Sequence, residues 1–230
     1  MPKAGAEALL DAGDPFARDL LDVLQLICPA PSLVNGELPP GDRAILRPDD
    51  GSTAEPGIMR TTTSGIDLRF FFKYDVDPEG GYLRIQTSTI GLSLTPSGRC
   101  LLRVEYDREK GPDQPDAHVH VDADGALWGK ALTLSGQPLR PLHTLHIPAG
   151  GRRFRPTMED FVEFLLGGRF VTPTSDGWRD VLRAKRREWE ERQARAAARR
   201  HEFAVADTLR GLGWTIHPPP EGGPVDPDGR

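Results

Sequence analysis

Regular alternation of apolar and polar residues in the middle of the chain constrains its fold more than any other feature. From Ile66 to Phe72, large apolar side chains occupy every second position, which is the period of a β-strand with one buried face. Further strand-like segments, separated by glycine- and proline-containing turns, lie at 82–87, 90–94, 101–106, 117–121, 132–134 and 142–147. About six short strands at this spacing predict a strongly curved antiparallel sheet and, with the helices around it, an α+β fold.

Two short helices are expected to pack against this sheet. The first spans 15–27, where Asp14 precedes a proline, as at many helix N-termini, and apolar residues then recur at helical spacing. The second spans 158–166, where Thr157 and Asp160 match the capping-box pattern with Asp in place of Glu. Its apolar residues form one stripe, so we expect that stripe to pack on a face of the sheet.

Composition divides the chain into four regions: an N-terminal helix with a proline-rich extended segment, the core of sheet and packing helix, a long basic helix, and a disordered tail. They span 1–56, 57–170, 171–216 and 217–230. The extended segment, 29–57, contains six prolines and few apolar residues, so we expect it to have no core of its own. The long helix is expected to begin at residue 175 or 176 and to run without a break to Leu209.

Net charge and composition exclude several classes of protein. The chain carries 29 Lys and Arg against 34 Asp and Glu, a formal net charge of −5, which argues against a uniformly basic surface for nucleic-acid binding. No apolar run reaches the roughly 18 residues of a membrane-spanning helix, and no sustained apolar stretch follows Lys3, so we expect no secretory signal. Cys28 and Cys100 cannot form a disulfide framework, so we predict a cytoplasmic location and regard both as small core residues.

Positive charge is concentrated in the long helix. Residues 179–200 contain nine Arg and Lys against four Asp and Glu, so this segment carries +5 and the rest of the chain −10. A basic helix on an acidic body favours a partner-binding arm or an RNA contact, with Arg186 and Arg187 as candidate binding residues. The alternative is a solvated helix stabilised by pairs such as Glu188–Arg192.

Histidines are clustered in the second half of the predicted sheet, where four of the six lie within 29 residues. Because side chains alternate along a strand, His118, His120 and Asp122 are expected on one face, and these three are the candidate catalytic residues. Two imidazoles side by side can chelate a transition metal. His143 or His146 could complete such a set, although a regular strand would present only one of them on that face.

Three interpretations of this group remain open. The first is a structural or solvent-facing pair, with Val119 and Val121 on the buried side of the strand. The second is RNA, phosphate or acid–base chemistry, and the third is a metal site; the pattern favours the first, so no metal or other cofactor is assigned. The order His-x-His, carboxylate, later His resembles the cupins, in which such residues line the mouth of a barrel. That resemblance covers His118, His120, Asp124 and one of the later histidines.

A glycine turn with three arginines precedes the second predicted helix. Arg152, Arg153 and Arg155 could bind an anion near the helix N-terminus at Thr157. The alternative is that these arginines pair with acidic residues in the first turn of the helix, such as Glu159.

Four segments together resemble a known group of sequences. They are Val104–Asp107, Ala117–Val121, Leu145–Pro148 and Arg155–Leu165. This combination of a Tyr-containing strand, a His-x-His strand and a helix with an acidic first turn resembles a group of bacterial, largely actinobacterial, proteins of uncharacterised function. It is more distantly similar to the small TumE-type toxins of toxin–antitoxin pairs. The resemblance implies an intracellular protein that acts with a protein partner and carries His118 and His120 on the exposed face of the sheet.

These observations lead to three candidate functions. The first is an interaction protein of a bacterial toxin–antitoxin or defence system, which binds a protein partner or RNA. The second is a metal-dependent, cupin-like enzyme that uses the central histidines. The third is a scaffold without chemistry, so the sequence leaves open whether the protein is an enzyme.

Overall fold

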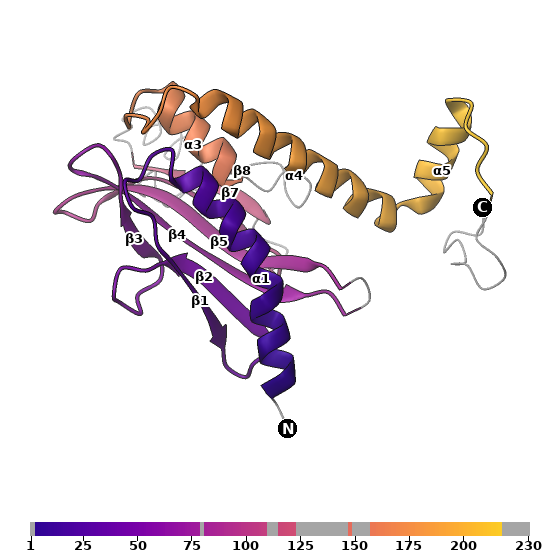
Figure 1. Cartoon of the computed structure of the whole chain (residues 1–230), viewed down its shortest axis with the longest axis horizontal. Coiled ribbons are helices and arrows are strands. Elements are labelled where there is room, and N and C mark those ends of the chain that lie inside the picture. The colour runs from indigo at the N-terminus through magenta and orange to yellow at the C-terminus, as the bar shows by residue number, and fades with distance from the viewer. Residues whose placement is uncertain (1–2, 79–80, 110–114, 123–146, 149–156, 218–230) are drawn as a thin grey trace, which may run out of the picture. The chain divides into compact units, whose positions relative to one another are not determined.

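The chain folds into a curved antiparallel sheet with flanking helices, which is the α+β class that the sequence predicts (Figure 1). The computed structural model describes residues 3–78, 81–109, 115–122, 147–148 and 157–217. The chain divides into two compact units, residues 1–182 and 183–230, and each is described by itself. The sheet and its hydrophobic core lie in the first unit.

Eight strands form one sheet, and all the strand pairs described are antiparallel. Their order across the sheet is β1-β2-β4-β5-β6-β7-β8, and β3 pairs with β4 along the same edge as β2. The strands are β1 (Leu33–Leu38), β2 (Arg43–Pro48), β3 (Gly57–Arg60), β4 (Ile66–Val76), β5 (Leu83–Leu94), β6 (Cys100–Asp107), β7 (Ala117–Val121) and β8 (Ile147–Pro148).

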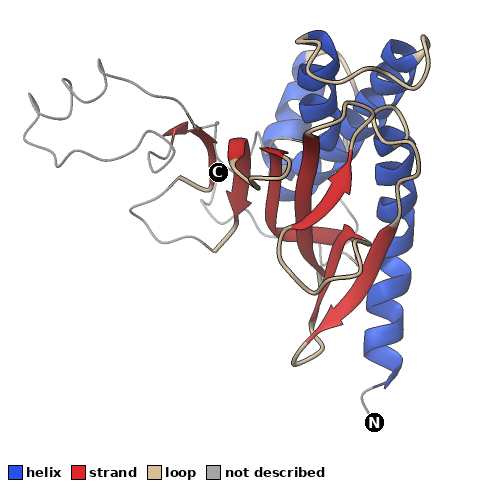
Figure 2. Ribbon diagram, turned by 90° about the vertical axis from the view of Figure 1, so that its left-hand side faces the viewer, coloured by secondary structure: helices blue, strands red, loops and turns tan. Residues whose placement is uncertain are grey.

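Alternation along the central strands builds the core. β4 buries Leu68, Phe70 and Phe72, each no more than 1% exposed, at every second position. Helix α1 (Lys3–Leu24) packs on β1, β2 and β4, and helix α3 (Met158–Gly167) contributes its apolar stripe to the same core, as predicted. In Figure 2, α1 leads from the N-terminus along one side of the sheet. The other face of the central strands is largely polar and carries the candidate site.

Most of the predicted strands are confirmed. β4, β6 and β7 occur where the alternation places them, whereas the segments 82–87 and 90–94 form one continuous strand, β5. The predicted strands at 132–134 and 142–147 lie outside the described residues, apart from Ile147, which begins β8.

The first helix begins earlier than predicted. Instead of starting at residue 15, α1 begins at Lys3 and contains Pro15. A proline inside a helix removes one helical hydrogen bond, so the turns before it must be held by packing. Leu9 is only 6% exposed, and the side-chain amide of Asn35 donates to the Leu10 carbonyl oxygen at 3.1 Å. Contacts with β1 therefore extend the helix beyond the start that local sequence predicts.

The segment 29–57 has no core of its own, as expected, but it is part of the sheet and not merely an extended segment, since its buried residues belong to the core shared with β4. β1 and β2 form a hairpin within it, and Leu46 of β2 pairs with Phe72 of β4. Ala44 and Leu46 are fully buried. The sequence did not reveal this strand because the apolar residues 44–46 are contiguous, without alternation, and prolines lie on both sides.

The predicted long helix is two helices. Helix α4 (Trp178–Arg200) ends where His201 leaves helical geometry, with φ −133° and ψ 43°, and helix α5 (Glu202–Gly211) follows. α4 buries Trp178 and Leu182 in its first turns. Its remainder presents mainly charged and alanine side chains, so no apolar stripe keeps the helix continuous across His201. The predicted tail at 217–230 lies outside the described residues, apart from His217.

The capping box at the start of α3 is confirmed. Thr157 Oγ1 accepts a hydrogen bond from the Asp160 backbone N–H at 3.2 Å, and the Asp160 carboxylate accepts one from the Thr157 N–H at 3.3 Å. We expect Thr157→Ala to lower the free energy of unfolding by about 1 kcal/mol in urea denaturation, because the helix loses its side-chain acceptor. Thr157→Ser should retain most of the stability, and an equal loss in both variants would contradict the capping role.

Candidate metal centre

Two neighbouring strands supply the residues of the candidate site. β6 and β7 pair so that Glu105 lies opposite His118 and Arg103 lies opposite His120. Alternate residues of a strand share a face, so these four residues lie on the face of the sheet opposite the α1 core. The predicted common face of His118 and His120 is therefore confirmed.

One carboxylate oxygen joins the two imidazoles. Oε2 of Glu105 lies 3.1 Å from Nε2 of His118 and 3.1 Å from Nε2 of His120. The two imidazole rings are 4.9 Å apart between centroids and stand at 76° to each other. Each of the three residues offers one potential ligand atom, and all three atoms lie within 4.8 Å of one another. The group is close enough to share one ion.

The histidines are buried, so the solvent-facing pair and the exposed face that the resemblance implies are wrong, whereas the structural pair is compatible with the burial. His118 is 0% exposed and His120 is 5% exposed, whereas Val119 and Val121, expected on the buried side, are half-buried. Val119 and Val121 lie on the core face, but α1 packs on β1, β2 and β4, at the other end of the strand order from β7, and so gives them little cover. Because buried imidazole nitrogens need hydrogen-bond partners, the contacts of His118 indicate which of its ring nitrogens carries a proton.

The contacts of His118 determine which ring nitrogen can bind a ligand. Nδ1 lies 3.2 Å from the backbone carbonyl oxygen of Pro115, and a carbonyl oxygen can only accept a hydrogen bond. Nδ1 therefore carries a proton, and a neutral ring then presents the lone pair of Nε2 to the Glu105 carboxylate. Two lone pairs facing each other require a cation between them, which is either a second ring proton or a metal ion. Metal-ligating histidines are commonly oriented in this way, by donating the other N–H to a carbonyl.

Glu105 is held as a carboxylate. Burial raises the pKa of Glu105, but the Arg103 charge and the contacts with His120 and His118 together outweigh it, so the pKa lies below its usual range. Arg103 Nε is 2.9 Å from Glu105 Oε1. That ion pair lacks hydrogen-bond alignment, since Arg103 Nε has no hydrogen-bond partner within the part of the chain that the structure describes. The carboxylate thus turns Oε1 towards Arg103 and Oε2 towards the histidines.

The spacing of the three ligand atoms suits a metal ion. Bonds of about 2.0–2.2 Å from zinc to imidazole nitrogen and carboxylate oxygen, at tetrahedral angles, place neighbouring ligand atoms roughly 3.3 Å apart. The two nitrogen-to-oxygen distances of 3.1 Å are close to that value. The ligand atoms of the two histidines lie within 4.8 Å of each other, so Glu105, His118 and His120 can coordinate one ion if these two nitrogens approach to about 3.3 Å.

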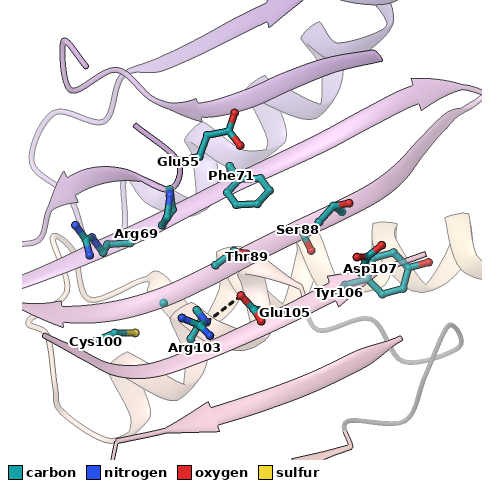
Figure 3. Close-up of a pocket in the computed structure, with 13 residues that line it drawn as sticks. Glu55, Arg69, Phe71, Ser88, Thr89, Cys100, Arg103, Glu105, Tyr106 and Asp107 are labelled. Carbon is teal, nitrogen blue, oxygen red and sulfur yellow. Dashed lines mark ion pairs between the residues drawn. The ribbon is translucent and has the colours of Figure 1, made fainter. Parts of the chain in front are cut away.

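A pocket of about 330 Å³ lies on the same face of the sheet and includes Glu105 in its wall (Figure 3). Its volume is at the lower end of the range for small-molecule sites. β4, β5 and β6 supply most of the lining, with Phe71, Thr89 and Arg103 among the residues that face it. Glu105 belongs both to this pocket and to the metal-ligand group, so a molecule in the pocket would lie beside the group.

Of the remaining histidine-region candidates, only Asp122 lies among the described residues, and it does not join the group. Asp122 forms an ion pair with Arg99 and is not one of the three ligands. Asp122 follows the end of β7, where its backbone N–H donates to the Leu101 carbonyl oxygen at 2.9 Å, and its carboxylate is held by Arg99 and not by the histidines. The other candidates, His143, His146, Asp124, Arg152, Arg153 and Arg155, lie outside the described residues.

The candidate binding residues of the basic helix lie on α4, where Arg187 is exposed and Arg186 is half-buried. The predicted Glu188–Arg192 pair is present at 3.5 Å. A partner or RNA contact of this helix stays a prediction.

Neither cysteine has the character of a reactive thiol. Burial raises the pKa of Cys28 to about 12, and burial also raises the pKa of Cys100 above its usual value. Cys28 is a core residue as predicted, whereas Cys100 is only partly buried.

The sequence interpretation missed Glu105 as a site residue. The available signal was the polar alternation of Arg103, Glu105 and Asp107 within a predicted strand, just before the His-x-His strand. Two such strands joined by a loop form a hairpin with their polar faces together, but only the register shows that Glu105 lies opposite His118.

Comparisons with known proteins add no relative to this description. No protein-family model, no curated protein and no solved structure matches the chain. Among the helices that the structure describes, none is long and apolar enough to cross a membrane.

Proposed function

We propose that this protein binds one divalent transition-metal ion through Glu105, His118 and His120. The observation that carries the proposal is the contact set of His118: Nδ1 is committed to the Pro115 carbonyl, and Nε2 faces a carboxylate oxygen 3.1 Å away. A metal ion between these atoms would replace the repulsion of two lone pairs with coordination. His120 Nε2, at the same distance from that oxygen, supplies the third ligand.

The ligand set favours a catalytic over a structural metal ion. Two imidazoles and a carboxylate suit zinc and the neighbouring divalent ions of iron, cobalt and nickel. The three ligands found among the described residues would leave a coordination position for water or substrate, whereas structural zinc sites use four. Such an ion would polarise a bound oxygen or lower the pKa of a bound water. With a small-molecule pocket beside Glu105, we propose a metal-dependent enzyme that acts on a small molecule.

Titration of the metal-depleted, full-length protein with Co²⁺ tests this proposal. We expect the visible absorption of protein-bound Co²⁺ to saturate at one ion per chain, because one nitrogen- and oxygen-containing site is present in the described sheet. The signal should be competed away by one equivalent of Zn²⁺, which binds such sites more tightly than Co²⁺.

Two variants make the titration specific. The His118→Ala/His120→Ala variant should show no saturable site in the same concentration range. His201→Ala should still bind one ion, since His201 is exposed and lies at the N-cap of α5. Binding of one ion by a folded His118→Ala/His120→Ala variant would refute the assignment of these ligands.

A further inference from the structure

The pocket beside Glu105 holds two arginines on either side of a glycine. The sheet register places Arg69 of β4, Gly91 of β5 and Arg103 of β6 in one row across three strands. Strands about 4.8 Å apart put the two arginine backbones roughly 10 Å from each other. Figure 3 shows both arginine side chains at this pocket. Two long side chains at that separation can reach a common ligand above the glycine.

Both arginines have a buried Nε–H that forms no aligned hydrogen bond, although that of Arg103 lies 2.9 Å from Glu105 Oε1 in an ion pair. Nε of Arg69 and Nε of Arg103 are buried, and neither has a hydrogen-bond partner in the described structure. Buried donors of charged groups are rarely left unsatisfied, because losing water without a replacement acceptor is costly. Arg69 is tethered by its Nη1, which donates to the Gly98 carbonyl oxygen at 3.3 Å. The Nε of Arg69, which has neither a hydrogen bond nor an ion pair in the described structure, indicates a missing acceptor in this pocket.

Gly91 keeps the space between the arginines open. A Cβ atom at this position would lie 3.1 Å from the Leu102 carbonyl oxygen, 3.5 Å from Cys100 Sγ and 3.7 Å from Arg103 Cβ. Any side chain here would therefore crowd β6 and occupy the floor of the pocket between the two guanidinium groups.

The charges around the pocket leave Arg69 without a matching carboxylate. Glu55 pairs with Lys73 at 2.6 Å, and Glu105 is shared by Arg103 and the two histidines. Asp107 lies opposite Thr87, two residues along β6 from Glu105 and farther from the Arg69 row. No ion pair of Arg69 is found among the residues described, so no carboxylate there contacts its guanidinium group directly.

We infer that this pocket binds the oxoanion group of a small molecule, a carboxylate or a phosphate, between Arg69 and Arg103. Planar guanidinium groups recognise such oxygens with short, charge-assisted hydrogen bonds. The 330 Å³ volume limits the ligand to a small one, and Phe71 and Thr89 offer an apolar and a hydroxyl contact for the rest of it. The inference depends on the proposed function only in placing the ligand beside a metal ion.

Calorimetric titration of the metal-depleted, full-length protein tests the pocket by itself. The probes are inorganic phosphate, succinate and the uncharged analogue succinamide, at fixed ionic strength. We expect at least one charged probe to bind at one per chain and succinamide not to bind, and the comparison of phosphate with succinate identifies the kind of oxoanion. Arg69→Gln should weaken the binding at least tenfold, because a charge-assisted contact is lost. Arg60→Gln is the matched control, since Arg60 is an exposed arginine of the same sheet that does not line the pocket.

The outcomes separate this inference from the metal proposal. Absence of binding by both charged probes overturns it, as does equal weakening by Arg69→Gln and Arg60→Gln in folded proteins. Binding of succinamide as tightly as succinate also overturns it. Binding of one Co²⁺ per chain without oxoanion binding would support the proposed metal centre and contradict the proposed oxoanion site. Oxoanion binding without any Co²⁺ binding would support the proposed oxoanion site and contradict the proposed metal centre.

Discussion

Zinc should stabilise the native protein against unfolding, and Glu105→Gln should abolish this stabilisation. The three ligand atoms come together only when β6 and β7 pair, so the ion binds the folded state in preference to the unfolded chain. At a free zinc concentration 100 times the dissociation constant, the free energy of unfolding should rise by about 2.7 kcal/mol. Glutamine keeps the size of Glu105 but loses the charge that a divalent ion requires. Urea unfolding with zinc and with chelator measures the difference.

The same experiment distinguishes a metal ion from a proton between His118 and Glu105. A buried ion pair that loses one partner costs about 3–5 kcal/mol whether or not metal is present. Equal losses for Glu105→Gln in zinc and in chelator would therefore indicate an ion pair without a metal. His201→Ala should respond to zinc as the unchanged protein does, because this residue lies outside the cluster. A full zinc response in Glu105→Gln would contradict the proposed centre.

Local sequence signals predicted the elements whose structure is determined locally. The alternation from Ile66 to Phe72 became β4, and Thr157 with Asp160 formed the expected capping box of α3. Both signals depend on neighbouring residues only: the period of a strand and the reach of a side chain to its own helix turn. The α+β class followed from these elements.

Elements that depend on distant partners were not predictable in the same way. The first turns of α1 are held by Leu9 in the core and by Asn35 from β1, and neither contact is visible in the helix sequence itself. Leu46 of β2 is buried because it pairs with Phe72, 26 residues away in the sequence. The break at His201 has the opposite cause, since α4 lacks an apolar stripe that would hold one continuous helix.

In the candidate site, too, the local features were predictable from the sequence and the features that depend on distant residues were not. Strand alternation placed His118 and His120 on one face, which the register confirms. Their burial could not be predicted from β7, because the cover on a strand face comes from segments distant in the sequence. Glu105 could be identified as a site residue only from the register between β6 and β7. Asp122 was assigned to the site by extending the strand one residue beyond its end at Val121. Whether His143 or His146 contributes stays a prediction.

A large effect on folding is also expected from a substitution of Gly13 in α1. A Cβ atom there would lie 2.0 Å from Tyr74 Oη and 2.6 Å from Tyr74 Cζ. Tyr74 is 0% exposed, and its hydroxyl donates to Asn35 Oδ1 at 2.5 Å, while the Asn35 amide holds the Leu10 carbonyl. The ring cannot move aside without breaking this chain of contacts. We expect Gly13→Ala to lower the free energy of unfolding by about 3 kcal/mol, at the upper end of overpacking costs.

The sign of that effect separates helix packing from helix propensity. Alanine is the better helix former by about 1 kcal/mol, so propensity alone would make Gly13→Ala stabilising. Gly167→Ala is the matched control: this exposed glycine is the last residue of α3, and no atom lies within 4 Å of its Cβ position. We expect that variant to be neutral or slightly stabilised in urea denaturation. Adding Tyr74→Phe to Gly13→Ala removes the oxygen of the closest contact and should cost less than the two single losses combined. A Gly13→Ala protein as stable as Gly167→Ala would show that α1 does not pack on Tyr74 in this way.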